Sequence, residues 1–415
     1  ANGWRPYASA ARPWNSWTGS AKGGSQMQAH EGAKIRFQPR IRKGAFFDAS
    51  WRYGCRNFSV YNRTYISSTF SDPLEEYWHV INHVALWPVM GERQVEIAGP
   101  DAARFTQYLT PRNLDKCAVG QCKYALITAG DGGIVCDPIL LRPNKNRFWL
   151  STSDCDLELW TRAVADHAGM DVTVRDADVS VIQVQGPKSP GLMVNLVGED
   201  ILDLKYYWLM RAPFEGTELI ISRTGWSGEF GYEIYLDTPE LGDRLFDALM
   251  EAGKPFNVAP GAVNHVRRIE SGIQSWGLDM TLQHTPYEVG LGRLVDLAMP
   301  HPFVGRAALE RLKDQPLTKS LVGLVVEGDA LRPNEDIWPV YSDGAEVGRL
   351  TSLAYSPRLE RNIALATVDA ALSATETALQ VETWDGLRGA TVAPMPFLPK
   401  RQSTDARSLY AELCG

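Results

Sequence analysis

The sequence predicts an α+β fold of several domains that ends in a β-barrel-like domain. Three observations favour this class. Strand-like and helix-like segments mix without the regular spacing of βαβ units, and one strand–helix unit occurs twice. From about Leu321 onward, short strands alternate with turns such as Ser342-Asp343-Gly344. The chain has 415 residues, of which 44% are apolar, so it can fill the cores of two or three domains.

The repeated unit consists of an alternating strand, a Gly-Pro pair and a short amphipathic helix. One copy covers residues 94–109 and the other covers residues 181–196. The pairs Gly99-Pro100 and Gly186-Pro187 end the two strands. We therefore predict duplicated strand–helix units inside one larger domain.

Hairpins are predicted between and after the two copies. Residues 124–141 alternate apolar and polar side chains and are broken by Asp131-Gly132-Gly133. A turn at residues 142–146 leads into a strand at 148–152. Residues 219–224 are expected to pair with residues 232–236 across a glycine-containing turn.

The clearest helix signal begins at Thr238. Thr238 is a good N-cap, Pro239 suits the first helical position, and Gly253 is expected to end the helix. The predicted buried face consists of Leu241, Leu245, Phe246, Leu249 and Met250.

These signals divide the chain into four parts. Residues 1–44 are an N-terminal arm, of which 1–30 are irregular in composition. Residues 45–315 hold two intertwined α+β subdomains, residues 316–400 form the barrel-like domain, and residues 401–415 form a tail.

Composition narrows the classes of function. A net charge of −7 makes general nucleic-acid binding a poor candidate. No window approaches the apolar run that a membrane span needs, so no membrane partner is expected. Residues 1–30 lack the apolar core of a secretory signal, and the six cysteines form no C-x-x-C pair. We therefore expect a cytoplasmic protein with reduced thiols.

Common catalytic motifs are missing from the chain. There is no phosphate-binding loop, no dinucleotide fingerprint and no G-x-S-x-G nucleophile elbow. His79 and His83 stand four residues apart on an expected helix, but a metal site needs at least a third ligand. No metal is therefore predicted.

Four ordered stretches share the pattern of one family. They are Gly120–Tyr124 with Gly132–Asp137, then Ser222–Ile234, Arg268–Gly272, and Pro286–Gly292 with Phe303–Arg306. Together they resemble the tetrahydrofolate-dependent aminomethyltransferase superfamily, which is the family of the glycine-cleavage T-protein. The resemblance covers about residues 45–400 and implies a T-protein-like fold of several domains.

Four further stretches are similar to the dimethylsulfoniopropionate demethylase branch of this superfamily. They are residues 59–62, 92–96, 225–226 and 277–281. One departure concerns Pro88, which stands where that branch has an aspartate. If that carboxylate helps hold a cationic substrate, the substrate of this chain differs.

The resemblance implies tetrahydrofolate as cofactor and assigns roles to residues. Glu233 is expected to accept two N–H groups from the pteridine edge. Asp137 is the predicted catalytic residue, which orients the folate amines and stabilises positive charge when N5 takes up carbon. Tyr124 and Trp226 are expected to be flat walls of the site. Arg268 either meets the anionic folate tail or pairs with a nearby carboxylate.

Five more residues complete the predicted site. They are Ser151 and Asn264 for the cofactor, and Trp87, Tyr206 and Trp208 for the substrate pocket.

The resemblance implies a one-carbon transferase that demethylates a small, dimethylsulfoniopropionate-like donor and transfers the carbon to N5 of tetrahydrofolate. Three alternatives stay open. The first is cleavage of an aryl methyl ether or methylenedioxy ring. The second is the glycine-cleavage aminomethyl reaction, and the third is a non-catalytic folate-binding assembly factor. The expected partner is a small molecule, and the oligomeric state is left open.

Overall fold

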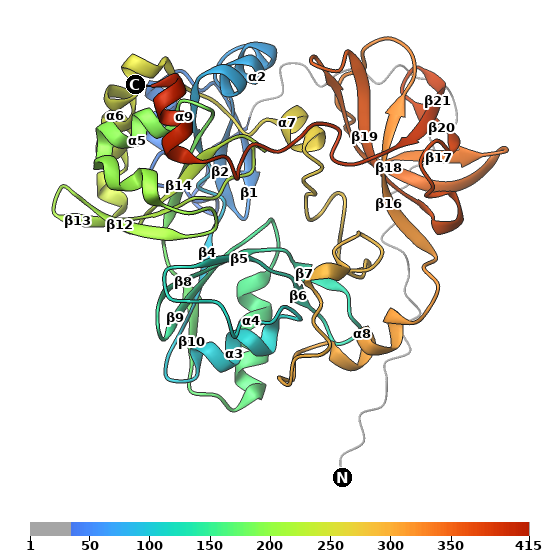
Figure 1. The fold of residues 1–415 in the computed structure, drawn as a ribbon, viewed down its shortest axis with the longest axis horizontal. Helices are drawn as coiled ribbons and strands as arrows, with labels where there is room; N and C mark the ends of the chain where they lie inside the picture. The colour runs from blue at the N-terminus through green and yellow to red at the C-terminus, as the bar shows by residue number, and fades with distance from the viewer. Residues whose placement is uncertain (1–34, 415) are drawn as a thin grey trace.

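The computed structural model describes residues 35–414. Two mixed lobes and a barrel surround a common centre in Figure 1, with the barrel at the upper right. The irregular stretch expected at residues 1–30 lies outside the described residues. The longest helix that is described has 12 residues, and none of the described helices qualifies as a membrane span.

The helices and strands follow one another in a mixed order, as the sequence predicts. The helices are α1 (Phe47–Arg52), α2 (Pro73–Asn82), α3 (Ala102–Leu109), α4 (Leu157–Ala168), α5 (Ser189–Val197), α6 (Gly242–Ala252), α7 (His265–Glu270), α8 (Arg306–Lys313) and α9 (Ala406–Leu413). The strands before the barrel are β1 (Asn57–Tyr61), β2 (Thr64–Thr69), β3 (Val84–Pro88), β4 (Gln94–Ala98), β5 (Cys122–Tyr124), β6 (Ile127–Thr128), β7 (Ile134–Cys136), β8 (Ile139–Asn144), β9 (Arg147–Ser151), β10 (Thr173–Asp176), β11 (Ser180–Gln185), β12 (Leu209–Phe214), β13 (Thr217–Ser222), β14 (Gly231–Leu236) and β15 (Val258–Pro260).

The upper-left lobe of Figure 1 is built on a six-stranded sheet with the order β12-β13-β14-β11-β3-β15. Its strands are antiparallel except β15, which runs parallel to β3. Apolar side chains of α5 and α6 share one core with β14 and β11. The C-terminal residues, expected only as a tail, include α9, and its Ala406 belongs to the same core.

The lower lobe is built on a five-stranded antiparallel sheet with the order β10-β4-β9-β8-β5. The helices α3 and α4 supply Phe105, Leu109 and Leu157 to its core. Figure 1 shows both helices against this sheet, so the lobe has a helical layer and a sheet layer.

The two copies of the strand–helix unit are present, but they lie in different sheets. The first is β4 with α3, and the second is β11 with α5. Gly99 and Gly186 have φ values of 137° and 120°. A Cβ atom there would lie 2.5 Å from the Asp171 carbonyl oxygen and 2.3 Å from that of His83. Each copy therefore needs glycine because another backbone segment packs against the turn.

The C-terminal barrel is closed, with the strand order β16-β19-β18-β17-β20-β21. Its strands are β16 (Lys319–Val326), β17 (Trp338–Ser342), β18 (Ala345–Ser356), β19 (Arg361–Asp369), β20 (Ala378–Thr383) and β21 (Gly386–Ala393). Alternating side chains such as Leu324, Val340 and Ala366 point into one apolar core.

The helix predicted from Thr238 begins differently from the sequence signal. Pro239–Leu241 form a 3₁₀ turn, and α6 starts at Gly242. The Thr238 side chain does not cap it, because its hydroxyl bonds that of Thr217 at 3.0 Å. Tertiary pairing to the β13 hairpin thus replaces the predicted cap.

The hairpin predicted at residues 124–141 is present in two parts. β5 pairs with β8 and β6 pairs with β7, with a break between them. The Ala125 N–H still donates to the carbonyl oxygen of Pro138 at 3.0 Å. Proline has no backbone N–H, so Pro138 cannot donate the second hydrogen bond of a regular antiparallel pair. Asp137 therefore lies where the ladder is interrupted.

Candidate active site

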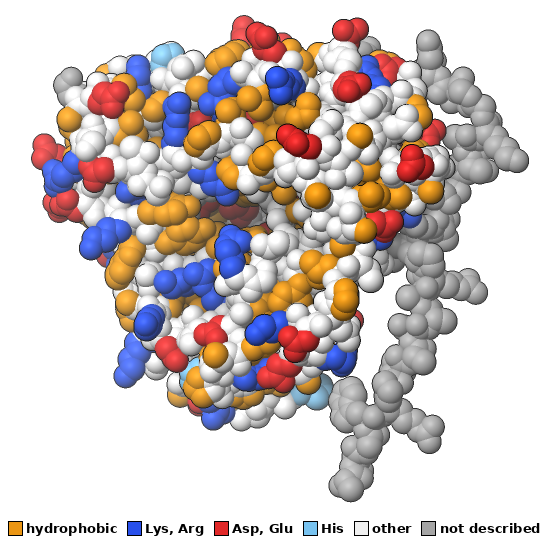
Figure 2. Space-filling view, turned by 45° about the vertical axis from the view of Figure 1, so that its right-hand side comes forward, with side chains coloured by type: hydrophobic (Ala, Val, Ile, Leu, Met, Phe, Trp, Pro, Cys, Tyr) orange, Lys and Arg blue, Asp and Glu red, His pale blue; other side chains and the backbone are white. Residues whose placement is uncertain are grey.

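A cavity of about 1140 Å³ lies between the two sheets. Its lining comes from the β1–β2 hairpin, from β5, β8 and β14, and from the loop at residues 272–278. The surface is hollowed near the centre of Figure 2, where basic and apolar side chains surround the depression. None of the residues in the barrel strands contributes to this lining.

Glu233 is held at the cavity by three hydrogen bonds. On β14, Tyr232 and Ile234 point into the core, so Glu233 faces the other way, as the sequence predicts. Its Oε2 accepts from the hydroxyl of Thr224 at 2.5 Å and from that of Tyr235 at 2.9 Å. Its side chain is buried, and burial raises the pKa of Glu233.

A second carboxylate, Glu92, lies beside Glu233. The Gln183 side-chain amide donates to Glu233 Oε1 at 2.8 Å and to Glu92 Oε1 at 3.3 Å. Burial first, and then the charge of Glu233, raise the pKa of Glu92 well above its ordinary value. The pair therefore holds a proton at a pH where two isolated carboxylates would both be ionised.

Asp137 forms a separate acidic point on the cavity wall. Its Oδ2 accepts from the Tyr124 hydroxyl at 3.0 Å, and its Oδ1 accepts from the Ser153 hydroxyl at 2.5 Å. Burial raises the pKa of Asp137 to about 6, and the two hydrogen bonds oppose that rise. Asp137 is therefore poised to change charge just below neutral pH.

Most of the predicted site residues meet at this cavity. Those that line it are Trp87, Tyr124, Asp137, Ser151, Tyr206, Trp226 and Glu233. Ser151 accepts a hydrogen bond from the Gln94 amide at 2.8 Å, and Tyr206 donates to Gln402 at 3.1 Å. Those contacts fix the orientation of two lining side chains.

Three predicted residues do not line the cavity. Asn264 caps α7, where its Oδ1 accepts from the Arg267 N–H at 3.0 Å. Trp208 packs against the core of the six-stranded sheet. Arg268 is fully buried beneath the wall, with its guanidinium 5.5 Å from the Trp226 ring.

For Arg268, the structure shows the ion-pair alternative that the sequence left open. Its guanidinium pairs with Asp279 at 2.7 Å and donates to the Ser352 hydroxyl at 2.6 Å. Because Asp279 also accepts from the backbone of Ser275, this pair fixes the cavity loop. Ser352 belongs to β18, so a barrel strand contacts the buried side of Arg268.

A second buried cluster ties α7 to its surroundings. Glu270 pairs with Arg267 at 2.9 Å and with Arg358 of the barrel lobe at 2.6 Å. The Tyr77 hydroxyl of α2 donates to Glu270 at 2.6 Å. Residues from α2, α7 and the barrel lobe therefore share one charge network.

Sequence reasoning missed several lining residues. Tyr61 and Glu92 stand in stretches that carry the family resemblance, which was the only signal for them. Lys123 also stands in such a stretch, on β5. The sequence analysis assigned no role to the other lining residues Arg112, Ser153, Tyr207, His265, Trp276, Arg293 and Lys400.

His79 and His83 lie next to each other, and the buried Nδ1 atom of His83 has no hydrogen-bond partner among the described residues. Their rings lie 5.2 Å apart, and the His79 Nε2 atom lies 3.1 Å from the Val84 carbonyl oxygen. All six cysteines have free thiols.

Comparison with known proteins adds independent information. Residues 29–299 match the family described as the GCVT N-terminal domain, and residues 319–398 match the glycine cleavage T-protein C-terminal barrel domain. The chain is 38% identical to dimethylsulfoniopropionate demethylase DmdA of Ruegeria pomeroyi over 85% of its own length and 96% of that protein. It is 34% identical to an aminomethyltransferase of Streptomyces avermitilis, over 73% and 83% of the two chains.

A solved structure agrees in fold. The aminomethyltransferase T of the glycine cleavage system from Bartonella henselae superposes with a TM-score of 0.78, at 22% identity, over 87% of this chain and 99% of that one. The matched ranges, the cavity between two sheets and the closed barrel lead to one conclusion. The chain belongs to the glycine-cleavage T-protein (aminomethyltransferase) family.

Proposed function

We propose that the chain is a tetrahydrofolate-dependent one-carbon transferase that demethylates a small methylated donor. The observation that carries this proposal is the cavity, whose lining combines the aromatic side chains Tyr124 and Trp226 with the carboxyl groups of Glu92, Glu233 and Asp137. The 38% identity to a dimethylsulfoniopropionate demethylase supports the same reading.

The lining fits a folate at both of its ends. A pteridine edge offers two neighbouring N–H donors, and Glu233 Oε1 accepts only one hydrogen bond from the described residues. Gln183 Oε1 is buried nearby and has no partner among those residues. The anionic tail of a folate is matched by cations that line the cavity, namely Arg112, Lys123, Arg293 and Lys400.

The residues of the chain do the positioning. Tetrahydrofolate, when bound, supplies N5 as the atom that takes up the carbon. Asp137, in its ionised form, stabilises positive charge that develops beside it, and Tyr124 and Ser153 hold its carboxylate in place. Trp226 and Tyr206 line the cavity and leave less of it open to water. No activated serine or cysteine is required, in keeping with the missing motifs.

A cationic donor suits the charges at this site. Glu92, Asp137 and Asp154 line the cavity, and within residues 35–414 none of them takes part in an ion pair. A sulfonium donor leaves as a neutral sulfide, so its departure needs no general acid. Dimethylsulfoniopropionate is the representative of this class that we propose.

An aromatic donor is the second candidate. Pro88 lines the cavity at the position where the demethylase pattern has an aspartate, and Trp87, Trp226 and Trp276 line it as well. These features favour a neutral, flat aryl methyl ether or methylenedioxy ring. The aminomethyl reaction would instead need a lipoyl carrier protein as its partner.

A donor screen with tetrahydrofolate tests the proposal. The purified protein is incubated with dimethylsulfoniopropionate, methoxybenzoates or methylenedioxybenzoates, and the folate product is identified by mass spectrometry. We expect a methyl- or methylene-tetrahydrofolate from one donor class. Folate binding without any such product would favour the non-catalytic binding protein instead.

A further inference from the structure

Tyr61 lies at the end of β1, on the cavity wall, and no role has been assigned to it. Its side chain is half-buried, and none of the described residues forms a hydrogen bond with its hydroxyl. Burial, followed by the charges of Glu92 and Asp137, raises the pKa of Tyr61 well above its ordinary value. Asp154 acts in the same direction, so three carboxyl groups of the cavity lining influence this hydroxyl.

The turn next to Tyr61 has a demanding backbone. Asn62 and Arg63 join β1 to β2, and their φ values are 47° and 55°. Two consecutive positive φ values define the type I′ turn, in which asparagine is favoured at the first position. The turn therefore fixes where β1 ends and where the Tyr61 side chain emerges.

The Asn62 side chain joins this turn to the wall that holds Asp137. Its Nδ2 donates to the carbonyl oxygens of Gly91 at 2.9 Å and Ser153 at 2.8 Å. Its Oδ1 accepts from the Cys155 N–H at 3.1 Å. Gly91 precedes Glu92, and Ser153 donates to Asp137, so one side chain sets the distance of the hairpin from both carboxylates.

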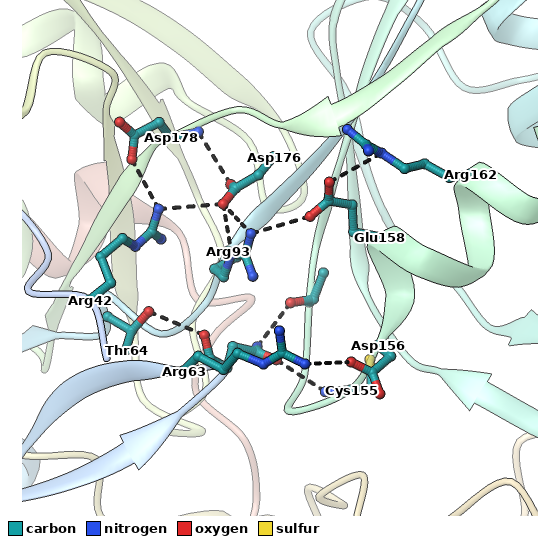
Figure 3. Close-up of polar contacts among 12 residues, drawn as sticks. Arg42, Arg63, Thr64, Arg93, Cys155, Asp156, Glu158, Arg162, Asp176 and Asp178 are labelled. Carbon is teal, nitrogen blue, oxygen red and sulfur yellow. Dashed lines mark hydrogen bonds and ion pairs between the residues drawn. The ribbon is translucent and has the colours of Figure 1, made fainter. Parts of the chain in front are cut away.

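Ion pairs hold the outside of the same region, as Figure 3 shows. Arg63 lies 3.8 Å from Asp156, in the loop after β9. Arg42 and Arg93 come from two other segments and both pair with Asp176. Of these ion pairs, only the exposed Arg63–Asp156 pair involves the hairpin directly, so Asn62 provides the main attachment of the turn to this wall.

This arrangement produces an electronegative wall with an aromatic ring in its middle. An onium ion has no N–H or O–H group to be matched, so it is recognised by ring faces and by nearby negative charge. A neutral tyrosine near Asp154 and the ionised form of Asp137 provides both, whereas Glu92 shares a proton with Glu233. The Tyr61 hydroxyl is neutral at physiological pH, as in an ordinary tyrosine, and the raised pKa extends this neutral range to higher pH.

We propose that Tyr61 is a specificity-determining residue that contacts the methyl donor and selects a positively charged one, and that Asn62 positions it. This inference rests on the proposed function, since it names the part of the cavity that receives the donor. It separates a donor wall, formed by the β1–β2 hairpin, from a folate wall that contains Glu233.

The test uses two readouts on the full chain saturated with tetrahydrofolate. One is the affinity for tetramethylammonium, an onium ion that does not transfer its methyl groups, measured by calorimetry. The other is the KM for dimethylsulfoniopropionate. Tyr61→Leu should weaken tetramethylammonium binding at least tenfold and raise the KM for dimethylsulfoniopropionate by a similar factor. The tetrahydrofolate Kd should stay within twofold of the wild type. Tyr61→Phe should retain most onium binding because the ring remains.

Two further variants test whether Asn62 positions Tyr61 or whether any change in the hairpin alters donor binding. Asn62→Gly keeps the backbone conformation and removes the side-chain contacts, so we expect a higher donor KM with an unchanged tetrahydrofolate Kd. Val60→Ala is the matched control, because Val60 is on the same strand, is exposed and does not line the cavity. It should leave both readouts as they are in the wild type.

The possible outcomes are distinct. A Tyr61→Leu protein that loses folate affinity but keeps its onium affinity would overturn the inference and move the hairpin to the folate wall. Absence of tetramethylammonium binding in the wild-type protein would overturn it too. If no donor is turned over while Tyr61→Leu still abolishes onium binding, the proposed reaction fails and the cation site stands.

Discussion

At Asp137, two effects on one carboxyl group compete, and the stronger one sets the pH range of activity. Burial favours the neutral acid, whereas the Tyr124 and Ser153 hydroxyls favour the anion. Burial wins, and the pKa of Asp137 is raised to about 6. The residue is therefore only partly ionised in mildly acidic solution.

We expect kcat/KM to rise with pH around a midpoint near 6, because the ionised carboxylate is the form that stabilises positive charge. Asp137→Asn should lower turnover more than folate binding and remove this rise. Asp343→Asn, in an exposed barrel turn, is the control and should keep the wild-type profile. A rise that persists in Asp137→Asn would assign the titration to another group.

The same pKa has the opposite consequence for stability. Between about pH 4 and pH 6 the native state holds a proton that the unfolded chain releases. The free energy of unfolding should therefore fall as the pH rises through this window, by up to about 3 kcal/mol. Urea titrations of the wild type and of Asp137→Asn at several pH values would measure the difference, and equal slopes would contradict it.

Glu233→Gln should weaken folate binding by about 2–4 kcal/mol, since it removes a charge-assisted acceptor and places an NH₂ group near the Gln183 amide. Calorimetry with tetrahydrofolate measures the loss. Glu240→Gln, on the exposed 3₁₀ turn, serves as the control. Affinity within twofold of the wild type would remove Glu233 from the folate site.

For single residues, the local sequence pattern predicts the orientation of Glu233 but not that of Arg268. Alternation along β14 decides which face Glu233 occupies, and this is local information. Whether Arg268 points into the cavity or pairs with a buried group depends on where Asp279 and Ser352 lie. Neither residue is its neighbour in the sequence. Tyr61 was missed because nothing local shows that a hairpin end faces a cavity.

Among the elements, the β1–β2 turn is under backbone strain at Arg63. A non-glycine residue at a φ of 55° is disfavoured, and glycine is preferred at the second position of a type I′ turn. Arg63→Gly should therefore stabilise the protein by about 0.5 kcal/mol after the entropy cost of glycine. Urea unfolding checks this, and a loss of stability would show that the Asp156 ion pair matters more.

The helix α7 depends on buried charge. Replacing Arg268 by Met leaves Asp279 without its cation, which should cost about 3–5 kcal/mol in the free energy of unfolding. The double variant Arg268→Met, Asp279→Leu should recover part of this, because no charge is then buried alone. The folate affinity of the folded Arg268→Met protein should stay within threefold. A selective loss of affinity with normal stability would restore Arg268 as a folate contact.

Element prediction succeeded where the periodicity was long and failed where tertiary contacts intervene. The two strand–helix units were visible because alternation, Gly-Pro and amphipathicity agree. Their placement in two different sheets was not visible, since each copy satisfies the same local rules in either sheet. The Thr238 cap was wrong because a hydroxyl from β13 competes for that side chain.

At the scale of the whole molecule, the cavity lies between two sheets, and few segments of the chain pass from one sheet to the other. A ligand that binds there joins both lobes and is released on unfolding. Tetrahydrofolate at about 100 times its Kd should raise the free energy of unfolding by about 2.7 kcal/mol. Thermal melts with and without folate measure this. Glu233→Gln at the same folate concentration should show a smaller shift, and no shift in the wild type would contradict the site.

Global architecture was only partly accessible from the sequence. The closed barrel could be anticipated, because short strands and turns recur at its spacing. The contacts between the barrel and α7 could not be anticipated. Ser352 and Arg358 bond to α7 residues that are far from them in the sequence. These long-range pairs follow from the packing of the lobes and not from any local pattern.

The β1–β2 hairpin has a consequence for how this enzyme family can diversify. The wall that it contributes, Ser59, Tyr61, Ile66, Ser67 and Ser68, comes from one short segment of the sequence, residues 59–68. The rest of the lining comes from residues scattered from position 87 to position 402. A single recombination event, or one synthetic cassette, can therefore exchange this segment while leaving the rest of the lining unchanged.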